Sequence, residues 1–270
     1  MKMRFVWLLP LFLVAAARPS QAQNTNVTPA GLIPLPSDTT LVHLDTPALL
    51  VEKAVDARLD FRVFGGDENV TYTSLFVQYG FGDGWAGVLR GSFAGRKNHS
   101  LSSGDFIRHG GSDIELLAKY QPKNTDRVVA LLGIALPDTS AQNDPVITLG
   151  IAAGAPVGRG ITAYLNPRAV LVEDNALFGL GLGVRARIGE NAALVADWTP
   201  LLSGENTRRT SDASRKRESV YGIAVRFARP DTAVTFDLGY ANGTGSTTGF
   251  ALTPGLGGSG AFFAAVSYRR

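Results

Sequence analysis

Apolar residues alternate with small or charged residues between positions 178 and 188. One set of alternate positions is apolar, and the other contains only glycine and arginine. The apolar set is Phe178, Leu180, Leu182, Val184, Ala186 and Ile188, and the other set is Gly179, Gly181, Gly183, Arg185 and Arg187. A period of two predicts a β-strand whose faces meet different surroundings. In a transmembrane barrel the apolar face contacts lipid and the other face lines the interior.

The region that follows residue 48 begins with the same pattern. Between residues 55 and 64, apolar positions alternate with Asp56, Arg58, Asp60 and Arg62. Charges of alternating sign on one face can pair with each other or with neighbouring strands. We therefore expect this face to line the interior.

Similar stretches recur along the chain, and their connections differ in length. The predicted strands cover residues 55–64, 70–79, 85–93, 113–121, 127–136, 146–155, 161–172, 176–187, 192–202, 218–227, 232–240 and 260–269. Every second connection is short, and three of the others, at residues 95–111, 203–217 and 241–258, are long. Outer-membrane barrels have short periplasmic turns and long extracellular loops. The sequence therefore predicts an all-β fold, a transmembrane antiparallel up-and-down β-barrel of about 12 strands with both termini periplasmic.

Pro167 falls within the seventh predicted strand. Proline has no N–H to donate, and a closed barrel has no free edge to accommodate it. We therefore expect a bulge or a break in the hydrogen-bond ladder there.

The first residues have the pattern of a secretory signal peptide. Lys2 and Arg4 give a positive start, residues 5–17 are apolar, and residues 20–22 form a small-x-small cleavage site. We therefore divide the chain into a signal peptide at residues 1–22, an irregular periplasmic lead-in at 23–48, and an outer-membrane β-barrel at 49–270. Part of the lead-in can tuck into the mouth of the barrel.

Composition and charge narrow the class further. Three of the 26 basic residues (Lys2, Arg4 and Arg18) leave with the signal peptide, so the mature chain has 23 basic and 23 acidic residues. A neutral chain gives no electrostatic reason to expect nucleic acid as a partner. The chain has no cysteine, which excludes disulfides, thiolate metal sites, a cysteine nucleophile and a lipid anchor on cysteine.

Two consecutive strands carry a family resemblance. Residues 110–120 read Gly-Gly-Ser-Asp-Ile-Glu-Leu-Leu-Ala-Lys-Tyr, and the apolar strand at 129–136 ends in Leu-Pro-Asp-Thr. This resembles the bacterial family of outer-membrane transporters named for the meta-pathway of phenol degradation. With the hairpin at 176–202, the resemblance covers about residues 110–228. It implies a monomeric barrel that lets small, aromatic solutes through, and it brings no residue-level site.

Fourteen charged side chains are predicted to line the lumen, nine basic and five acidic. They are Asp56, Arg58, Asp60, Arg62, Arg90, Glu115, Lys119, Arg168, Arg185, Arg187, Asp197, Arg226, Asp237 and Arg269. A basic lining raises the local concentration of anions and favours anionic solutes. Alternatively, these long side chains pair across the lumen and fill it.

A lipid hydrolase at the barrel rim is a third hypothesis, and it needs a histidine that activates a serine. His43 lies in the lead-in, and His99 and His109 lie in one long loop. None of them is on a lipid-facing strand beside an outward serine, so we expect no enzyme activity. We find no cofactor-binding or metal-ligand spacing and expect no cofactor.

Two long loops have marked compositions. The loop at 203–217 carries Arg208, Arg209, Arg215, Lys216 and Arg217, which suit either lipopolysaccharide phosphates or a solvated flexible loop. The glycine-rich stretches at 243–246 and 255–260 have no strand-then-helix context, so we expect flexible loop there rather than a phosphate site.

The function that the sequence favours is passive transport of small solutes, anionic or aromatic, across a Gram-negative outer membrane. The alternatives are a closed-lumen scaffold or surface-interaction protein, and the rim lipid hydrolase. The expected partners are outer-membrane lipid, lipopolysaccharide, the barrel-assembly machinery and small solutes, but not nucleic acid. We expect a monomer.

Overall fold

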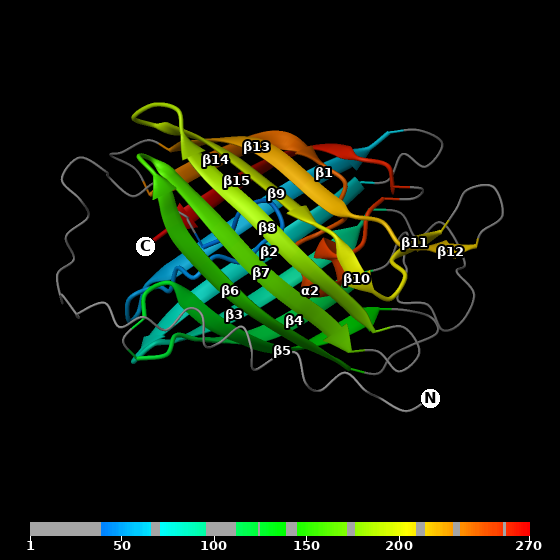
Figure 1. Cartoon of the computed structure of the whole chain (residues 1–270), viewed down its shortest axis with the longest axis horizontal. Coiled ribbons are helices and arrows are strands. Elements are labelled where there is room, and N and C mark those ends of the chain that lie inside the picture. Colours follow the sequence, from blue (N-terminus) through cyan, green and yellow to red (C-terminus); the bar gives the residue numbers. More distant parts are fainter. Residues whose placement is uncertain are drawn as a thin grey trace. The chain divides into compact units, whose positions relative to one another are not determined.

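The chain forms a closed antiparallel β-barrel in the computed structural model (Figure 1). The structure describes residues 39–65, 71–95, 112–123, 125–138, 145–171, 176–208, 214–228, 233–255 and 258–270. No helix in these ranges is long and apolar enough to cross a bilayer.

Twelve strands make the barrel wall. They are β1 (Val55–Phe64), β2 (Thr71–Gly82), β3 (Trp85–Ala94), β4 (Ser112–Tyr120), β5 (Val128–Asp138), β6 (Val146–Gly158), β7 (Ile161–Leu171), β8 (Leu177–Arg187), β9 (Ala192–Thr199), β13 (Val220–Ala228), β14 (Val234–Ala241) and β15 (Ala261–Arg269). After Pro200, β9 continues as β10 (Leu201–Ser203), and both pair with β8. A separate ribbon of β11 (Thr207–Arg208) and β12 (Arg215–Lys216) lies in the connection that follows.

Pairing of the first strand with the last closes the barrel. In β1, Leu59 lies opposite Leu75 of β2 on one side and Val266 of β15 on the other. The other wall strands pair with their neighbours in sequence. Closure removes the sheet edges, whose unpaired backbone groups are costly in a bilayer. The predicted antiparallel barrel of about 12 strands is confirmed.

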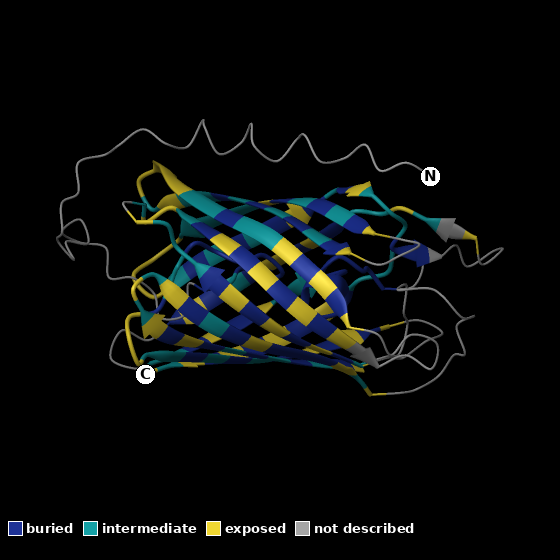
Figure 2. Cartoon of the chain, turned by 90° about the horizontal axis from the view of Figure 1, so that it is seen from below, coloured by how far each residue is buried: buried dark blue, intermediate teal, exposed yellow. Residues whose placement is uncertain are grey.

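The wall has an apolar outer face and a polar inner face. Figure 2 shows buried and exposed residues alternating along each strand. Leu132, Leu182 and Phe236 face outward and are exposed, whereas Asp237, the residue after Phe236, is buried. This arrangement is typical of a barrel that stands in lipid.

Aromatic side chains gather at both ends of the wall. At the end with the short turns, the rings of Trp85 and Tyr120 are 4.5 Å apart, and Tyr79 lies at the same end. At the end with the long loops, Tyr240 and Phe262 are 5.4 Å apart. Such belts are typical of the two interfaces between membrane and water.

Pro167 interrupts the ladder of β7 without shifting its register. The pairing of β6 with β7 breaks off after Gly150 and resumes in the same register at Ala153. The carbonyl of Ile151, which lies opposite Pro167, accepts a hydrogen bond from Asn166 Nδ2 at 2.7 Å. The side chain of the preceding residue thus replaces the N–H that proline lacks. The break expected at this position is present.

Candidate functional site

Residues 39–50, which precede β1, lie inside the barrel, and we call them the inner segment. Leu41 and Leu44 are 1% and 0% exposed. The segment folds back on itself, because the N–H of Leu41 donates to the carbonyl of Leu44 (2.9 Å) and that of Thr46 donates to the carbonyl of Thr39 (3.1 Å). It enters from the short-turn end, where β1 begins. Of the lead-in expected at residues 23–48, the structure describes only residues 39–48, and these fill barrel space.

Glycines on the inner face of β8 make room for the leucines of the inner segment. A Cβ at Gly181 would lie within 3.0 Å of Leu44, and one at Gly183 would lie within 3.0 Å of Leu41. Real Cβ atoms do not approach other atoms so closely, so only glycine fits here. The glycines that alternate with apolar residues in β8 therefore form a packing surface and not the lining of a water-filled channel.

The connection between β14 and β15 also folds into the barrel, from the long-loop end. We call residues 242–255 the inward loop; it contains a single helical turn, α2 (Thr248–Ala251), whose four residues are buried (Figure 1). The sequence predicts an extracellular flexible loop at residues 241–258. That interpretation is wrong for the inward loop, which packs inside the barrel because its small polar residues find partners on the wall.

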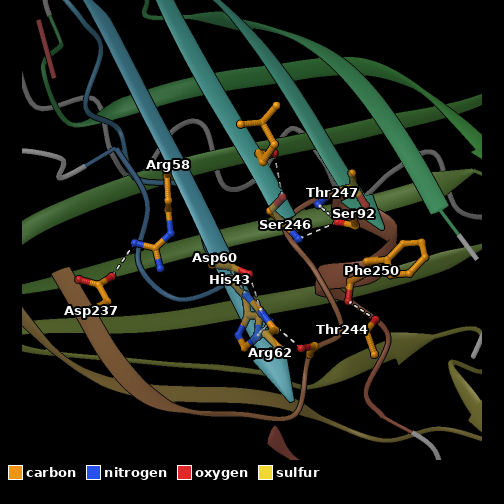
Figure 3. Close-up of polar contacts among 12 residues, drawn as sticks. His43, Arg58, Asp60, Arg62, Ser92, Asp237, Thr244, Ser246, Thr247 and Phe250 are labelled. Atoms are coloured by element: carbon orange, nitrogen blue, oxygen red, sulfur yellow. Dashed lines mark hydrogen bonds and ion pairs between the residues drawn. The ribbon is translucent and has the colours of Figure 1, made fainter. Parts of the chain in front are cut away.

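Hydrogen bonds tie the inward loop to β3 and β4. The N–H of Ser246 donates to Ser92 Oγ of β3 at 2.9 Å (Figure 3). The N–H of Thr248 donates to Glu115 Oε2 of β4 at 2.8 Å. Both acceptors are buried side chains of the wall, so the loop satisfies groups that burial would otherwise leave unpaired.

His43 of the inner segment lies between an acid and an arginine of the wall. Its Nδ1 is 2.8 Å from Asp197 Oδ1 of β9, and its Nε2 is 2.8 Å from Arg62 Nη1 of β1. A guanidinium group only donates, so Nε2 accepts, and the ring proton lies on Nδ1 and is donated to Asp197. His43 is therefore neutral. Its backbone N–H also donates to Asp197 Oδ2 at 2.7 Å.

The Asp45 carboxylate lies between two cations of the wall. Arg90 of β3 donates to its Oδ1 through Nη2, and Lys119 Nζ of β4 is 3.0 Å from the same oxygen. Both cations lie over the ring of Phe76 of β2, at 5.5 and 5.8 Å from its centroid. Two adjacent strands thus hold one carboxylate of the inner segment, and a third places an aromatic ring against the two cations.

The surroundings lower the pKa values of both His43 and Asp45. The result is a neutral imidazole in one case and a charged carboxylate in the other. Burial lowers the pKa of His43 below its ordinary value of 6.5, although Asp197 acts to raise it. Burial alone would raise the pKa of Asp45, but the two cations beside it lower that pKa to about 2. At neutral pH the docked inner segment therefore carries an uncharged imidazole and a charged carboxylate.

Two wall arginines connect the inner segment with the inward loop. Arg62 Nη1 contacts His43 Nε2 and donates to the carbonyl of Gly243 at 2.5 Å. Arg168 donates to the carbonyls of His43 (2.6 Å) and Ala251 (3.3 Å). The segments that enter from opposite ends thus meet inside the barrel.

Further charges pair within the wall itself. Arg58 Nη1 is 2.5 Å from Asp237 Oδ2, and Arg226 donates to both oxygens of Asp237 at 2.9 Å. Arg62 Nη2 is 3.0 Å from Asp60 Oδ2. Both partners of each of these pairs belong to the wall, and none belongs to the inner segment.

Eleven of the fourteen predicted lumen residues are buried. They are Asp56, Arg58, Asp60, Arg62, Arg90, Glu115, Lys119, Arg168, Asp197, Arg226 and Asp237. The half-buried ones are Arg185, Arg187 and Arg269. Arg187 donates to the carbonyls of Gly189 and Glu190 in the adjacent turn, and Arg269 lies 3.2 Å from Asp56. A role of any of these residues in solute selectivity stays a prediction.

Among the described residues, sequence reasoning missed three buried titratable side chains, namely His43, Asp45 and Asp113. The first two precede the first predicted strand, so strand alternation assigns them no face. The available signal was three apolar residues, Leu41, Val42 and Leu44, among the polar residues of positions 37–46. Apolar residues in a lead-in need a surface to pack on, and the glycines of β8 provide it.

A small cavity adjoins the inner segment. Its volume is about 20 Å³, and the residues that line it include His43, Arg58, Phe76 and Ser246. That volume holds about one water molecule. In the part of the chain that the structure describes, the inner segment and the inward loop occupy the centre of the barrel.

The described residues do not assemble a hydrolytic or metal site. The ring nitrogens of His43 contact Asp197 and Arg62, and among the described residues no serine contacts this ring; His99 and His109 lie outside the described residues. No group of three or more His, Asp or Glu side chains in the described ranges is placed to hold a metal ion.

Comparison with known proteins identifies the fold. No protein-family model matches the chain, and no curated protein sequence matches it. A NanC porin structure is 13% identical with a TM-score of 0.52, covering 79% of this chain and 98% of that chain. The COG4313 outer membrane channel from Pseudomonas putida F1 is 15% identical with a TM-score of 0.52, covering 87% of this chain and 98% of that chain.

At this identity the likeness shows the fold alone. It is the fold of Gram-negative outer-membrane, porin-like barrels. Within this class, the protein described here is a twelve-stranded barrel with an inner segment and an inward loop in its interior. The resemblance to the phenol-degradation family is not confirmed by these matches.

The substitution Gly183→Val tests the packing of the inner segment. Its Cβ would lie within 3.0 Å of Leu41, whereas the nearest wall atom, the carbonyl oxygen of Ala196, is 3.5 Å away. The new side chain should therefore expel the segment and leave the wall in place. Because the chain has no cysteine, a Val42→Cys reporter in the buried segment gives a single labelling site. We expect maleimide labelling of folded protein to become faster by about tenfold or more, as a loss of about 1.4 kcal/mol or more of docking energy requires. The control is Gly189→Val, where an added Cβ meets nothing within 4 Å; equal labelling of both variants would contradict the packing.

Acidification should release the inner segment. The docked state disfavours a proton on His43, which faces Asp197, Arg62 and Arg168, so the undocked state binds more protons below pH about 6.5. Docking is therefore complete above this pH and weakens as the pH falls, by about 1.4 kcal/mol per unit until the docked pKa is reached. Labelling of the Val42→Cys reporter should rise below pH about 6.5. In a His43→Gln background this rise in labelling should vanish. Only the release below pH about 4 that protonation of Asp45 causes should remain. An unchanged rise would show that another group is responsible.

Proposed function

We propose that this protein stands in the Gram-negative outer membrane and lets small solutes pass when the inner segment leaves the barrel. One observation carries the proposal: side chains, and not the sheet, hold the inner segment. Its described backbone-to-backbone hydrogen bonds join the segment to itself. Its bonds to the wall involve the side chains of His43, Asp45, Asp197, Arg90 and Arg168. Departure of the segment thus breaks no ladder of the barrel.

The two matched structures are by name a porin and an outer membrane channel, which agrees with this proposal. The filled interior then corresponds to a closed state. Opening requires the inner segment to move out at the short-turn end. The ion pairs around Asp237 lie within the wall and do not depend on the inner segment.

We infer that the open barrel prefers anionic solutes. Asp45 leaves with the inner segment, so Arg90 and Lys119 lose the carboxylate between them. The fourteen predicted lumen residues have nine basic members against five acidic ones. A positive lining concentrates anions. Preference for aromatic solutes rests on the family resemblance alone.

A barrel that stays closed is the second candidate. The tight packing of the glycines of β8 against the inner segment favours a closed barrel. The small volume of the cavity beside the segment also favours it. The protein would then act as a scaffold or through its long loops. The two candidates differ in whether current flows once the anchors of the inner segment are removed.

The outward contacts follow from the same proposal. We assign the apolar outer face to membrane lipid and the basic ribbon of β11 and β12 to lipopolysaccharide phosphates. In that loop, Arg217 donates to the carbonyls of Leu202 and Gly204. We therefore do not assign this guanidinium to a phosphate. We propose a monomer that the barrel-assembly machinery inserts.

The double variant His43→Ala, Asp45→Ala tests the proposal. It removes both anchors, each a buried hydrogen-bonded contact worth about 1.5–3 kcal/mol where a charge is involved. In planar bilayers we expect the native protein to be mostly silent. The variant should show discrete openings, with open probability higher by about two orders of magnitude or more and a reversal potential that indicates anion preference.

The matched control is Glu52→Ala, Lys53→Ala, which removes an exposed ion pair just beyond the inner segment. It should stay as silent as the native protein. A silent His43→Ala, Asp45→Ala variant whose folding is shown by heat-modified gel migration would instead support the closed scaffold.

A further inference from the structure

The Asp45 carboxylate occupies a site that the barrel wall builds. Arg90 and Lys119 come from adjacent strands and are 2% and 0% exposed. Among the described residues, Lys119 forms its ion pair with Asp45. Arg90 has a second acid at 3.5 Å, Glu115 Oε2, which also accepts from the inward loop. The wall by itself therefore holds one arginine and one lysine that converge on a single carboxylate position.

An apolar surface adjoins the two cations on the same inner face. Val88 and Leu117 lie opposite each other in the antiparallel pairing of β3 with β4, and this pair lies between Arg90 on one side and Lys119 on the other. They belong to a buried cluster of wall residues, Phe76, Val88, Leu117, Val129, Leu131 and Ala152. Such a cluster is unusual for a lumen face, where polar side chains are the rule. We therefore expect an apolar group to cover this cluster.

The inner segment provides both a carboxylate for the two cations and an apolar side chain for the cluster. Its Asp45 places a carboxylate on the cations, and Leu49, four residues later, packs on the apolar cluster. Once the segment leaves, two buried cations lose a partner and an apolar surface meets water. Buried cations without a partner are costly, so this surface favours a ligand that restores both contacts.

We propose that the open barrel binds small carboxylic acids with an apolar body at this site, and that Asp45 and Leu49 occupy it in their place while the barrel is closed. The inference rests on the proposed function, because the site becomes accessible only when the inner segment leaves. The carboxylate lies between Arg90 and Lys119 with the ring of Phe76 beside it, and the apolar body covers Val88 and Leu117. A solute that binds there also competes with the inner segment and favours the open state.

Equilibrium binding tests the site independently of current. The full chain with His43→Ala and Asp45→Ala, folded in detergent, is titrated by calorimetry with hexanoate, hexanamide and acetate. We expect hexanoate to bind about tenfold or more tightly than hexanamide, which lacks the charge, and than acetate, which lacks the apolar body. Adding Lys119→Gln should abolish the preference for hexanoate over hexanamide. Equal binding of hexanoate and hexanamide, or of hexanoate and acetate, would overturn the proposal.

The native anchors provide a second measurement in case the double variant does not fold. In the chain with only the Val42→Cys reporter, hexanoate at millimolar concentration should speed maleimide labelling several-fold, and hexanamide should not. No effect of hexanoate would overturn the competition. A variant that conducts but binds no hexanoate refutes this site alone, whereas a variant that binds hexanoate but never conducts refutes the proposed passage of solutes and leaves the site standing.

Discussion

A charge that is buried inside the barrel needs a partner, and this requirement determines what the interior contains. The wall satisfies part of it alone, since Arg58 and Arg226 share Asp237. Elsewhere the wall is incomplete. Lys119 and Asp197 find their partners on the inner segment. Arg90 gains Asp45 there in addition to its wall partner Glu115. The inner segment is thus held by buried wall charges for which it supplies partners.

Shape imposes the second constraint. The inner face of β8 lacks side chains at Gly181 and Gly183, and the leucines of the inner segment fill the space. The inward loop uses the same strand, because a Cβ at Gly179 would lie within 3.0 Å of Leu252. One strand therefore receives both segments. The inner segment contacts the wall through side chains, so its departure would leave the backbone ladder of the wall intact.

The wall could be predicted from the sequence because its signal is local. A strand shows its period of two within ten residues, and the lengths of the connections show which end is which. The contents of the interior depend instead on pairs that are far apart. His43 and Asp197 are 154 residues apart in the sequence, and alternation indicates which face a residue has but not which partner it meets. The inward loop was missed for a related reason, since glycine, serine and threonine suit an exposed loop and a buried hydrogen-bonded one equally.

A reversible cross-link between the inner segment and the wall tests the central claim most directly. A Cβ at Gly222 would lie 2.8 Å from that of Val42, so the inner segment has to move away from β13 by about 0.7 Å or more to reach the roughly 3.5–4.5 Å that a disulfide spans. In the His43→Ala, Asp45→Ala background, Val42→Cys with Gly222→Cys should form this disulfide in the folded protein. Single-channel recording should then show a silent barrel under oxidising conditions and discrete openings after reduction. Identical currents before and after reduction, with the disulfide verified by mass spectrometry, would contradict the claim that the inner segment closes the barrel.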